Sequence, residues 1–390
     1  MERKKSEVTE EAFPHDSTLI VLCNMKEPSN SVAAQGWKRL KKNKPAMAGF
    51  IIIVFVMLLA IFGYMIVPDN SPDADLQTIE IQAKKPGYTQ MFLLIPETGN
   101  TRPNPIEEWF MGKKSTSRYL PITGYEIKGK ELIVSKYIDE DTTIKQVYSI
   151  DLLTGNKPGN ISSQIVTKKY WLGTDTFGRD MLSRLVVGAR VSLAVGFIAV
   201  LVSLILGILL GALAGYYRGW IDEVIMWFVN VTWSIPTLLL VFAVTIAMGK
   251  GFWQIFIAVG LTMWVSVARL VRGQVLALKE LEFVQAARAL GYKDGRIIFR
   301  HIIPNMLGPL MVIAAGNFAT AIIIEAGLSF LGIGVQAPQP SWGLMIKENY
   351  HFIITHNPLM ALLPGFAIMI LVLSFNLLGN GLRDALDVKD

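Results

Sequence analysis

The sequence has little charge and almost no cysteine. Of its 390 residues, 17% are Asp, Glu, Lys or Arg, and 52% are hydrophobic. An average soluble domain carries about a quarter charged residues, so this composition predicts an integral membrane protein. The single cysteine, Cys23, excludes an intrachain disulfide framework and cannot form a metal cluster alone, so we interpret it as an incidental thiol.

A nucleotide-binding motif is also lacking. Residues 112–115 read Gly-Lys-Lys-Ser, but Glu107 stands where a Walker A motif has its first glycine. The net charge of +6 is modest, and no basic stripe alternates with aromatic residues, which argues against nucleic-acid binding. We therefore expect no ATP hydrolysis, no catalytic residue and no bound cofactor in this chain.

Long apolar runs are what the sequence has instead. The first, residues 46–67, has 22 residues without a charge, enough to cross about 30 Å of hydrocarbon as a helix. We interpret it as an uncleaved span, because it lies far from the start and lacks a cleavage site of small residues. Together the apolar runs predict six transmembrane helices, at residues 46–67, 191–217, 224–249, 251–268, 302–324 and 357–382.

The distribution of basic residues predicts the orientation of these spans. Five lysines and arginines lie in residues 38–44, and seven more lie between residues 269 and 300. Because basic residues stay on the cytoplasmic side, both termini and the 269–300 loop are expected in the cytoplasm. Residues 326–346 are uncharged but are interrupted by Gly and Pro. We interpret them as the outer end of span five and an external turn.

These spans divide the chain into four parts. Residues 1–45 are a cytoplasmic tail, residues 46–67 the first span, residues 68–169 an extracytoplasmic insertion, and residues 170–390 a core with spans two to six. The second half of the insertion alternates polar and apolar residues around turns at residues 128–129 and 154–156, which predicts β-hairpins. Within the second span, Gly207, Gly211 and Gly215 form a face of small residues suited to close helix packing.

Residues 275–303 form the loop between spans four and five. Phe283, Ala286, Ala287 and Leu290 follow helical spacing and predict one apolar stripe. Gly291 breaks this helix. Asp294 is expected to cap a second short helix with Ile297 and Ile298 on its buried side, and Pro304 opens the next span. This order of helix, glycine, helix and proline is typical of a docking element.

Four stretches of the chain carry a resemblance to a known family. The loop has Gln285, Ala286, Ala287, Gly291, His301 and Pro304 at the spacing of the EAA loop of ABC-importer permeases, although Gln285 replaces an acidic residue and His301 an isoleucine. Residues 171–193, 325–343 and 375–384 resemble the dipeptide, oligopeptide and nickel permeases of the C type. The resemblance is strong over residues 170–390, weak over 38–67 and absent over 68–169.

This resemblance implies an all-α membrane protein with six spans of the type I ABC-importer kind, here with a small, β-containing extracytoplasmic insertion. It implies a bacterial inner-membrane permease for di- or oligopeptides that forms half of the translocation path. The implied partners are a homologous B-type permease, two cytoplasmic ATPases that use ATP and Mg, an external substrate-binding protein or lipoprotein, and membrane lipid. The ATPase-coupling residues would be Phe283, Gln285, Ala286, Ala287, Arg288, Leu290, Gly291, Asp294, His301 and Pro304.

Other polar residues are candidates for the pore or for substrate access. Glu325 and Asn317 lie in span five, and Asp175 and Arg179 precede span two. For Glu325 the simpler alternative is a carboxylate that pairs with an arginine or caps backbone. For Asn317 it is a hydrogen bond between helices, and for the segment with Asp175 and Arg179 an interfacial anchor. In that segment Thr174 or Asp175 is expected to cap a short helix, with Arg179, Arg184 and Arg190 at headgroup depth.

Metal binding and other classes of protein remain as alternatives. His351 and His356 lie in an external loop, but two histidines without a third ligand make a poor metal site, so none is predicted. The same machinery could import nickel or another small solute. A secondary transporter driven by an ion gradient would need paired repeats with broken helices, which we do not find. A signalling scaffold would not need a cytoplasmic docking loop.

Overall fold

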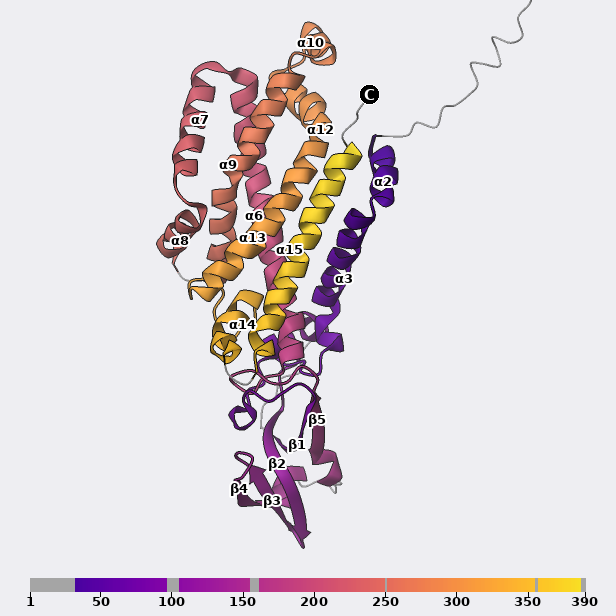
Figure 1. Ribbon diagram of the computed structural model, residues 1–390, viewed down its shortest axis with the longest axis vertical. Coiled ribbons are helices and arrows are strands. Elements are labelled where there is room, and N and C mark those ends of the chain that lie inside the picture. Colours follow the sequence, from indigo (N-terminus) through magenta and orange to yellow (C-terminus); the bar gives the residue numbers. More distant parts are fainter. Residues whose placement is uncertain (1–31, 97–104, 155–160, 250, 355–356, 387–390) are drawn as a thin grey trace, which may run out of the picture.

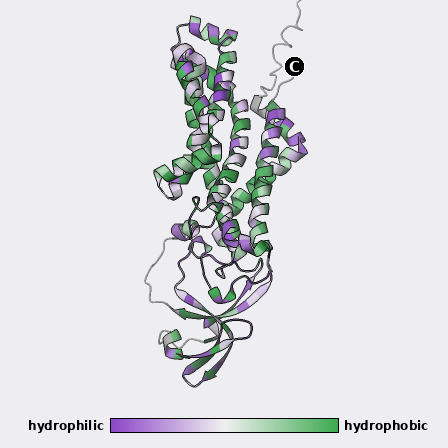
Figure 2. Cartoon of the chain, turned by 60° about the vertical axis from the view of Figure 1, so that its left-hand side comes forward, coloured by the Kyte–Doolittle hydropathy of each residue, from purple (hydrophilic) through white to green (hydrophobic). Residues whose placement is uncertain are grey.

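The computed structural model describes residues 32–386, except residues 97–104, 155–160, 250 and 355–356. A bundle of long helices occupies one part of the molecule, and a small β-sheet continues from one end of the bundle along the same axis (Figure 1). Cys23 and His356 lie outside the described residues. Hydrophobic residues cover the bundle helices along most of their length (Figure 2).

The predicted spans are helices in the structure, with different ends. Among the described residues, five helices are long and apolar enough to cross a membrane, and a bent pair makes six if it counts as one span. The five are α3 (Lys44–Ile66), α6 (Met181–Tyr217), α9 (Phe252–Leu278), α13 (Leu307–Phe330) and α15 (Leu359–Leu386). Helices α6 and α9 are longer than predicted, because each continues through polar residues beyond its apolar run.

The bent pair consists of α7 (Gly219–Ser234) and α8 (Thr237–Met248), which meet at an angle of 99°. The break falls at Ile235 and Pro236. A proline lacks the backbone N–H that would continue the helix, and it restricts the residue before it to extended backbone. The span predicted at residues 224–249 is therefore interrupted by nearly a right angle.

The segment before the first span contains a helix that the sequence analysis did not predict. Helix α2 (Val32–Lys42) carries Arg39, Lys41 and Lys42 in its last turn and ends where Asn43 caps α3. Leu40 is buried against Ala385 at the end of α15, so α2 packs on the bundle through one side. Of the last 14 residues of the predicted tail (32–45), all except the capping Asn43 are therefore helical.

The turn between α13 and α15 contains α14 (Trp342–Asn349) and a 3-10 turn, Tyr350–Ile353. With 8 residues, α14 is too short to cross a membrane. The interpretation of residues 326–346 as the end of span five and a turn is thus confirmed. α14 packs against both α13 and α15.

The insertion contains one antiparallel sheet in the order β4-β3-β2-β1-β5. The predicted hairpin at residues 128–129 is confirmed, with Gly129 at a φ of +63°. Strands β1 and β5 were not predicted. The first lies among prolines, and the second has too short an alternation of polar and apolar residues. The insertion's elements are η1 (Pro72–Ala74), η2 (Ile79–Ile81), β1 (Tyr88–Pro96), α4 (Pro105–Met111), β2 (Ser117–Lys128), β3 (Glu131–Tyr137), β4 (Thr143–Ser149), α5 (Ile150–Thr154), η3 (Ile161–Gln164) and β5 (Ile165–Tyr170).

Each face of this sheet has its own small core. Leu93, Leu120 and Leu132 are buried on one side with Leu153 and Ile161. The other side buries Ile81, Phe92, Tyr137 and Tyr170. A sheet covered on both faces supports an insertion that holds its own shape beyond the end of the bundle (Figure 1).

Helices α6 and α9 pack closely through the predicted glycine face. A Cβ placed on Gly207 would lie 2.4 Å from Val267, and one on Gly211 would lie 2.5 Å from the carbonyl oxygen of Ala268. A Cβ on Gly215 would lie 2.8 Å from Val275. The glycines therefore allow the two backbones to approach at a distance that no other residue permits.

We predict that Gly211→Ala destabilises the protein by about 1–3 kcal/mol, because its Cβ would overlap the backbone of α9. The matched control is Gly273→Ala on α9, where an added Cβ meets nothing within 4 Å. That change is expected to be neutral or to stabilise by about 1 kcal/mol, since alanine favours helix. The measurement is the midpoint of thermal unfolding in detergent, and equal midpoints for the two variants would contradict the close packing.

Candidate functional site: a docking loop and a buried ion cluster

The loop at residues 275–303 lies at the end of the bundle opposite the sheet (Figure 1). Its first helix is α10 (Glu282–Ala289), followed by Gly291 with a φ of +78°. Next come α11 (Asp294–Ile297), a π-helical turn (Ile298–Ile302) and α12 (Ile303–Asn305), which contains Pro304. The predicted order of helix, glycine, helix and proline is confirmed.

The apolar stripe of α10 is different from the predicted one. Val284 and Ala287 are buried against the bundle, in a cluster with Val271 and Val275 of α9. Phe283 and Leu290 are 40% and 73% exposed, and Ala286 is also exposed. Ala287 therefore attaches the loop to this chain, which corrects its expected place on an outward apolar face.

The second helix packs as predicted but is not capped as predicted. Ile297 and Ile298 are buried in the same cluster as Val284. Asp294, however, is already the first residue of α11, after Lys293 at the cap position. Because Asp294 lies inside the helix, its carboxylate does not cap the helix and instead accepts a hydrogen bond of 2.7 Å from the hydroxyl of Tyr216.

The other predicted loop residues make local contacts. Gln285 donates from Nε2 to the carbonyl oxygen of Glu280 at 3.1 Å. The ring of His301 stacks on Tyr292, with centroids 6.0 Å apart and an interplanar angle of 18°. These contacts stabilise the conformation of the loop. Phe283 on α10 and Leu290 directly after it remain exposed as large apolar side chains.

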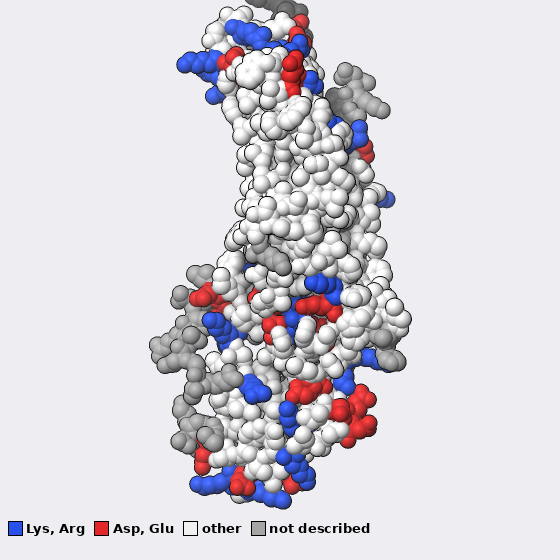
Figure 3. Space-filling model, turned by 90° about the vertical axis from the view of Figure 1, so that its left-hand side faces the viewer, with Lys and Arg blue, Asp and Glu red and all other residues white. Residues whose placement is uncertain are grey.

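A second polar site lies at the opposite end of the bundle, where the insertion joins α6. Two arginines, Arg179 and Arg184, are 1% and 0% exposed there. Their charges are balanced by carboxylates from three separate parts of the chain, namely Asp75, Asp175 and Glu348. Figure 3 shows mixed charges at this level, below an uncharged band that spans the bundle.

Arg179 binds all three carboxylates. Its Nε lies 2.7 Å from Asp175, its Nη1 3.0 Å from Asp75 and its Nη2 2.6 Å from Glu348. Burial opposes the charge of Arg179, but Asp175 and Glu348 outweigh it and raise the pKa of the guanidinium. Arg184 lies 3.3 Å from Glu348 and 3.5 Å from Asp75. The cluster joins the start of the insertion, the start of α6 and α14.

Arg179 and Arg184, which were expected at headgroup depth, are buried inside the protein within this cluster. Charged groups that are fully desolvated need paired charges, and the three carboxylates meet this need. Asp175 does not cap a helix. Its Oδ1 accepts from the backbone N–H groups of Phe177 and Arg179, and Thr174 binds Ile81 and Lys84. The helix cap is Asp180, which accepts from the backbone N–H of Ser183.

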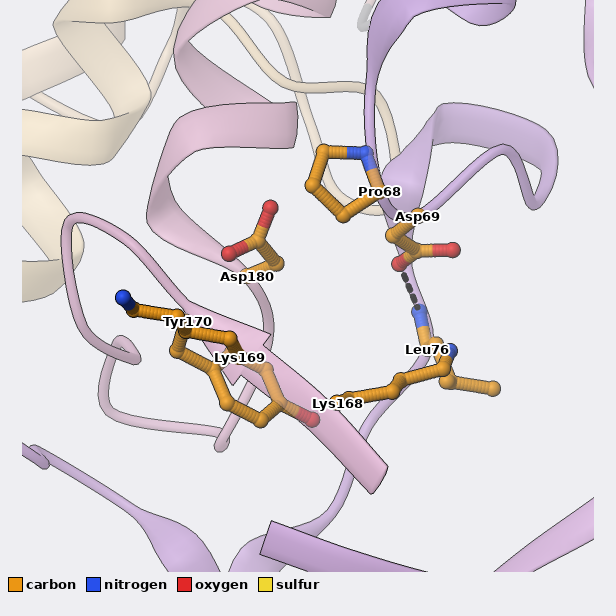
Figure 4. Close-up of a pocket in the computed structure, with 7 residues that line it drawn as sticks. All are labelled: Pro68, Asp69, Leu76, Lys168, Lys169, Tyr170 and Asp180. Carbon is orange, nitrogen blue, oxygen red and sulfur yellow. Dashed lines mark hydrogen bonds between the residues drawn. The ribbon is translucent and has the colours of Figure 1, made fainter. Parts of the chain in front are cut away.

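A small pocket beside the cluster lies between the insertion and α6 (Figure 4). Asp69 accepts a hydrogen bond from the backbone N–H of Leu76, and its own backbone N–H donates to Ser183 at 3.0 Å. Burial raises the pKa of Asp180 and lowers the pKa of Lys168, which line the same pocket. The residues around the pocket thus tie the two parts of the chain together.

The structure separates the remaining candidates from this cluster. Glu325 is 0% exposed, and its carboxylate lies 2.7 Å from Ser329 Oγ and 3.3 Å from Ser192 Oγ. Its hydrogen-bond partners are thus two serines, whereas the simpler alternative to a pore role was an arginine or the backbone. Asn317 is 7% exposed with a buried Nδ2 that has no hydrogen-bond partner, so the expected interhelical bond through that amide is not formed.

The described residues hold no group of three or more His, Cys, Asp or Glu side chains suited to a metal ion. His351 stacks obliquely on Phe352, with centroids 4.1 Å apart. Within the part of the chain that is described, the two polar sites are therefore a loop shaped for contact and a cluster of ion pairs.

Comparison with known proteins bears on what this arrangement serves. The profile of the family described as "Binding-protein-dependent transport system inner membrane component" matches residues 207–389. The profile described as "N-terminal TM domain of oligopeptide transport permease C" matches residues 31–84. The dipeptide transport system permease protein DppC of Alkalihalophilus pseudofirmus is 48% identical over 221 residues, which cover 57% of this chain and 72% of the relative.

The chain belongs to this family of ABC-importer permeases. The permease is also similar to the oligopeptide transport permease OppC of Bacillus subtilis, with 41% identity over 61% of this chain and 76% of the relative. The glutathione transport permease GsiD of Pectobacterium atrosepticum is 45% identical over 56% and 73% of the two chains. Among solved structures, the inward-facing MetNI methionine ABC transporter aligns with a TM-score of 0.44 and 21% identity, over 53% of this chain and 97% of that one.

The permease is thus a multi-pass membrane protein, and the predicted fold class and family are confirmed. The two matched profiles lie on either side of residues 85–206, which include most of the insertion and both arginines of the cluster. The site residues themselves stay predictions as to their role.

Sequence reasoning missed several residues of both sites. Asp75 and Glu348 lie 104 and 169 residues from Arg179, so no local pattern connects them. The four-residue spacing of Asp175 and Arg179 was a usable signal for an ion pair. Tyr216 was read as the end of an apolar run, although it binds the docking loop.

We predict that Gly291→Ala loosens the docking loop by about 1–2 kcal/mol, because a φ of +78° is strained for any residue with a Cβ. Nothing lies within 4 Å of the added atom, so the effect is one of backbone strain alone. The measurement is amide hydrogen exchange in α10 and α11, which we expect to become about tenfold faster.

Gly295→Ala is the matched control for this change. Gly295 lies in the same loop inside α11, and an added Cβ there also meets nothing within 4 Å. Its exchange rates should equal or fall below those of the unaltered protein. Equal rates in both variants would show that the loop does not depend on the left-handed turn.

We predict that Arg179→Met destabilises the protein by about 3–5 kcal/mol, because it leaves buried carboxylates without their main cation. Arg190→Met is the control, since Arg190 is half-buried and donates to the carbonyl oxygen of Phe110 at 2.7 Å. It is expected to cost about 1 kcal/mol. Thermal unfolding in detergent compares the two, and a stable Arg179→Met protein would contradict a structural role for the cluster.

Proposed function

We propose that this permease forms half of the translocation path of an ATP-driven importer of di- or oligopeptides. The observation that carries the proposal is the docking loop. Its inner face is buried in the bundle through Val284 and Ile297, while Phe283 and Leu290 stay exposed. Such a loop suits transmission of movement from a separate ATPase to the spans. The chain itself is no enzyme, and two cytoplasmic ATPases use ATP and Mg.

The charge distribution supports the orientation that this function needs. Figure 3 shows both signs of charge at the end with the docking loop as well as at the insertion end, but residues 269–300 hold seven basic residues against three acidic ones. Arg288, Lys293, Arg296 and Arg300 all lie in or beside the loop. By the positive-inside rule this end and both termini face the cytoplasm of a bacterial inner membrane.

The bent pair of helices supports a second permease as partner. In α7 and α8, the buried residues among those described are Val229, Val241 and Thr245. Large side chains such as Trp220 and Trp227 are 73% and 60% exposed. We assign this surface to contact with lipid and with a homologous B-type permease, which completes the path.

The cargo rests on the named relatives. Their names refer to dipeptides, oligopeptides and glutathione, all of which contain peptide bonds. A charged peptide cannot cross hydrocarbon unaided, so the two permeases would enclose a polar path. The alternative is the same machinery with nickel or another small solute as cargo. A secondary transporter is less compatible with the docking loop.

The insertion extends the proposal to the external substrate-binding protein. The sheet lies beyond the outer end of the spans and is held there by the arginine cluster (Figure 1). It is therefore placed to contact a binding protein or lipoprotein that delivers cargo. Deletion of residues 84–165 with unchanged uptake at low substrate would remove this role.

We predict that cells lacking this chain fail to take up labelled peptides, and that the intact gene restores uptake. Dipeptides, longer peptides and nickel are offered in parallel, so the same experiment reports the cargo and its length. A Leu290→Asp variant should reach the membrane but lose uptake, because it places a charge on the exposed apolar face of α10. Its ATPase should no longer co-purify in mild detergent.

Each outcome decides between the candidates. Lost nickel uptake with intact peptide uptake would keep the permease role and overturn the cargo. Full uptake by Leu290→Asp would overturn the docking role of α10. Absence of any ATPase from the purified unaltered complex would favour an ion-driven transporter.

A further inference from the structure

Tyr216, at the end of α6 next to the docking loop, contacts both helices of the loop and the end of α9. Tyr216 is 4% exposed and lies in the last turn of α6. Its hydroxyl donates to Asp294 Oδ1 of α11 at 2.7 Å. The same oxygen accepts from Arg288 Nη2 of α10 at 3.5 Å. One phenol thus binds both helices on either side of Gly291.

The same residue also holds the end of α9. Lys279 caps α9, and its Nζ donates to the carbonyl oxygen of Tyr216 at 2.6 Å. The ammonium lies 5.2 Å from the centre of the Tyr216 ring, and the Arg288 guanidinium lies 5.6 Å from it. Two cations over one aromatic ring add attraction to the hydrogen bonds.

The polar contacts of Tyr216 fix the orientation of the loop on the bundle, whereas the apolar contacts of the loop do not. Hydrophobic packing of Val284 and Ile297 is non-directional, so it allows the loop to slide or rotate on the bundle. A hydrogen bond weakens steeply when its angle changes. A further polar link, between Arg218 and Glu280, is 3.2 Å long, and both side chains are more than half exposed, so it contributes little.

We propose that Tyr216 is a positioning residue that makes α10 and α11 move as one unit with α6 and α9. The inference rests on the proposed coupling function and deepens it. When an ATPase pushes on the loop, the hydroxyl of Tyr216 transfers the movement to the two closely packed spans. Without the hydroxyl, the loop moves over the bundle and the push is lost.

The test uses the whole complex, with partner permease, ATPases and binding protein, in proteoliposomes. The probe is a radiolabelled mixture of alanine dipeptides to pentapeptides, and ATP hydrolysis is measured in the same vesicles. In Tyr216→Phe the ring stays in place and the carbonyl bond to Lys279 remains. We expect ATP hydrolysis to continue while the amount of peptide transported per ATP falls about fivefold, as loss of the short hydrogen bond to Asp294 implies.

Three further variants separate positioning from general stability. Tyr217→Phe removes a hydroxyl from the next residue, whose side chain is 46% exposed, and should transport normally. Asp294→Ala should match Tyr216→Phe, whereas Asp294→Asn keeps an oxygen acceptor and should restore coupling. The double variant Tyr216→Phe with Asp294→Ala should be about as impaired as either single change, since both remove the hydrogen bond between Tyr216 and Asp294.

The outcomes distinguish this inference from the function on which it rests. If the unaltered complex transports peptides and Tyr216→Phe keeps the same transport per ATP, the positioning role is overturned and the importer stands. If Tyr216→Phe lowers ATP hydrolysis and transport in equal proportion, the residue supports assembly rather than coupling, and the inference also fails. If the unaltered complex transports no peptide, the proposed cargo fails first.

Discussion

The close contact between α6 and α9 is the constraint on which the rest of the structure depends. Gly207, Gly211 and Gly215 bring the two backbones so near that neither helix can shift without breaking the packing. Helix α6 has 37 residues, so it is about 55 Å long and exceeds the hydrocarbon of a membrane at both ends. It therefore links two polar sites on opposite sides of the membrane in one rigid element.

These two sites use the same helix in different ways. At the end beside the insertion, Arg179 and Arg184 bind Asp75 and Glu348 and hold the insertion and α14 in place. At the opposite end, Tyr216 binds the docking loop. A push on the loop would thus reach the insertion end through one helix. Rigid coupling of distant sites through packed helices is a known route for conformational change. The buried ion pairs keep the insertion end of α6 from fraying.

The sequence predicted those parts of the docking loop that depend on local patterns. Gly291 interrupts the helix as expected, and Ile297 and Ile298 are buried as expected. Two overlapping stripes on α10 fit helical spacing: the predicted one, of which Phe283 and Leu290 are exposed, and a second one with Val284, beside which Ala287 is buried. Only the position of α9 selects the second stripe. Asp294 looked like a cap, but the neighbouring Tyr216 gives it a different partner.

By itself, the sequence determined the class of protein, the positions of the long apolar helices and the family, because hydropathy and short motifs act over a few helical turns. The β2–β3 hairpin followed for the same reason, since its turn and strands are adjacent in the chain. Tertiary structure decided which charges are buried, how the proline break orients α7 and α8, and that β1 and β5 join the sheet. These features depend on contacts between residues far apart in sequence, and no local preference encodes a partner that is more than a hundred residues away.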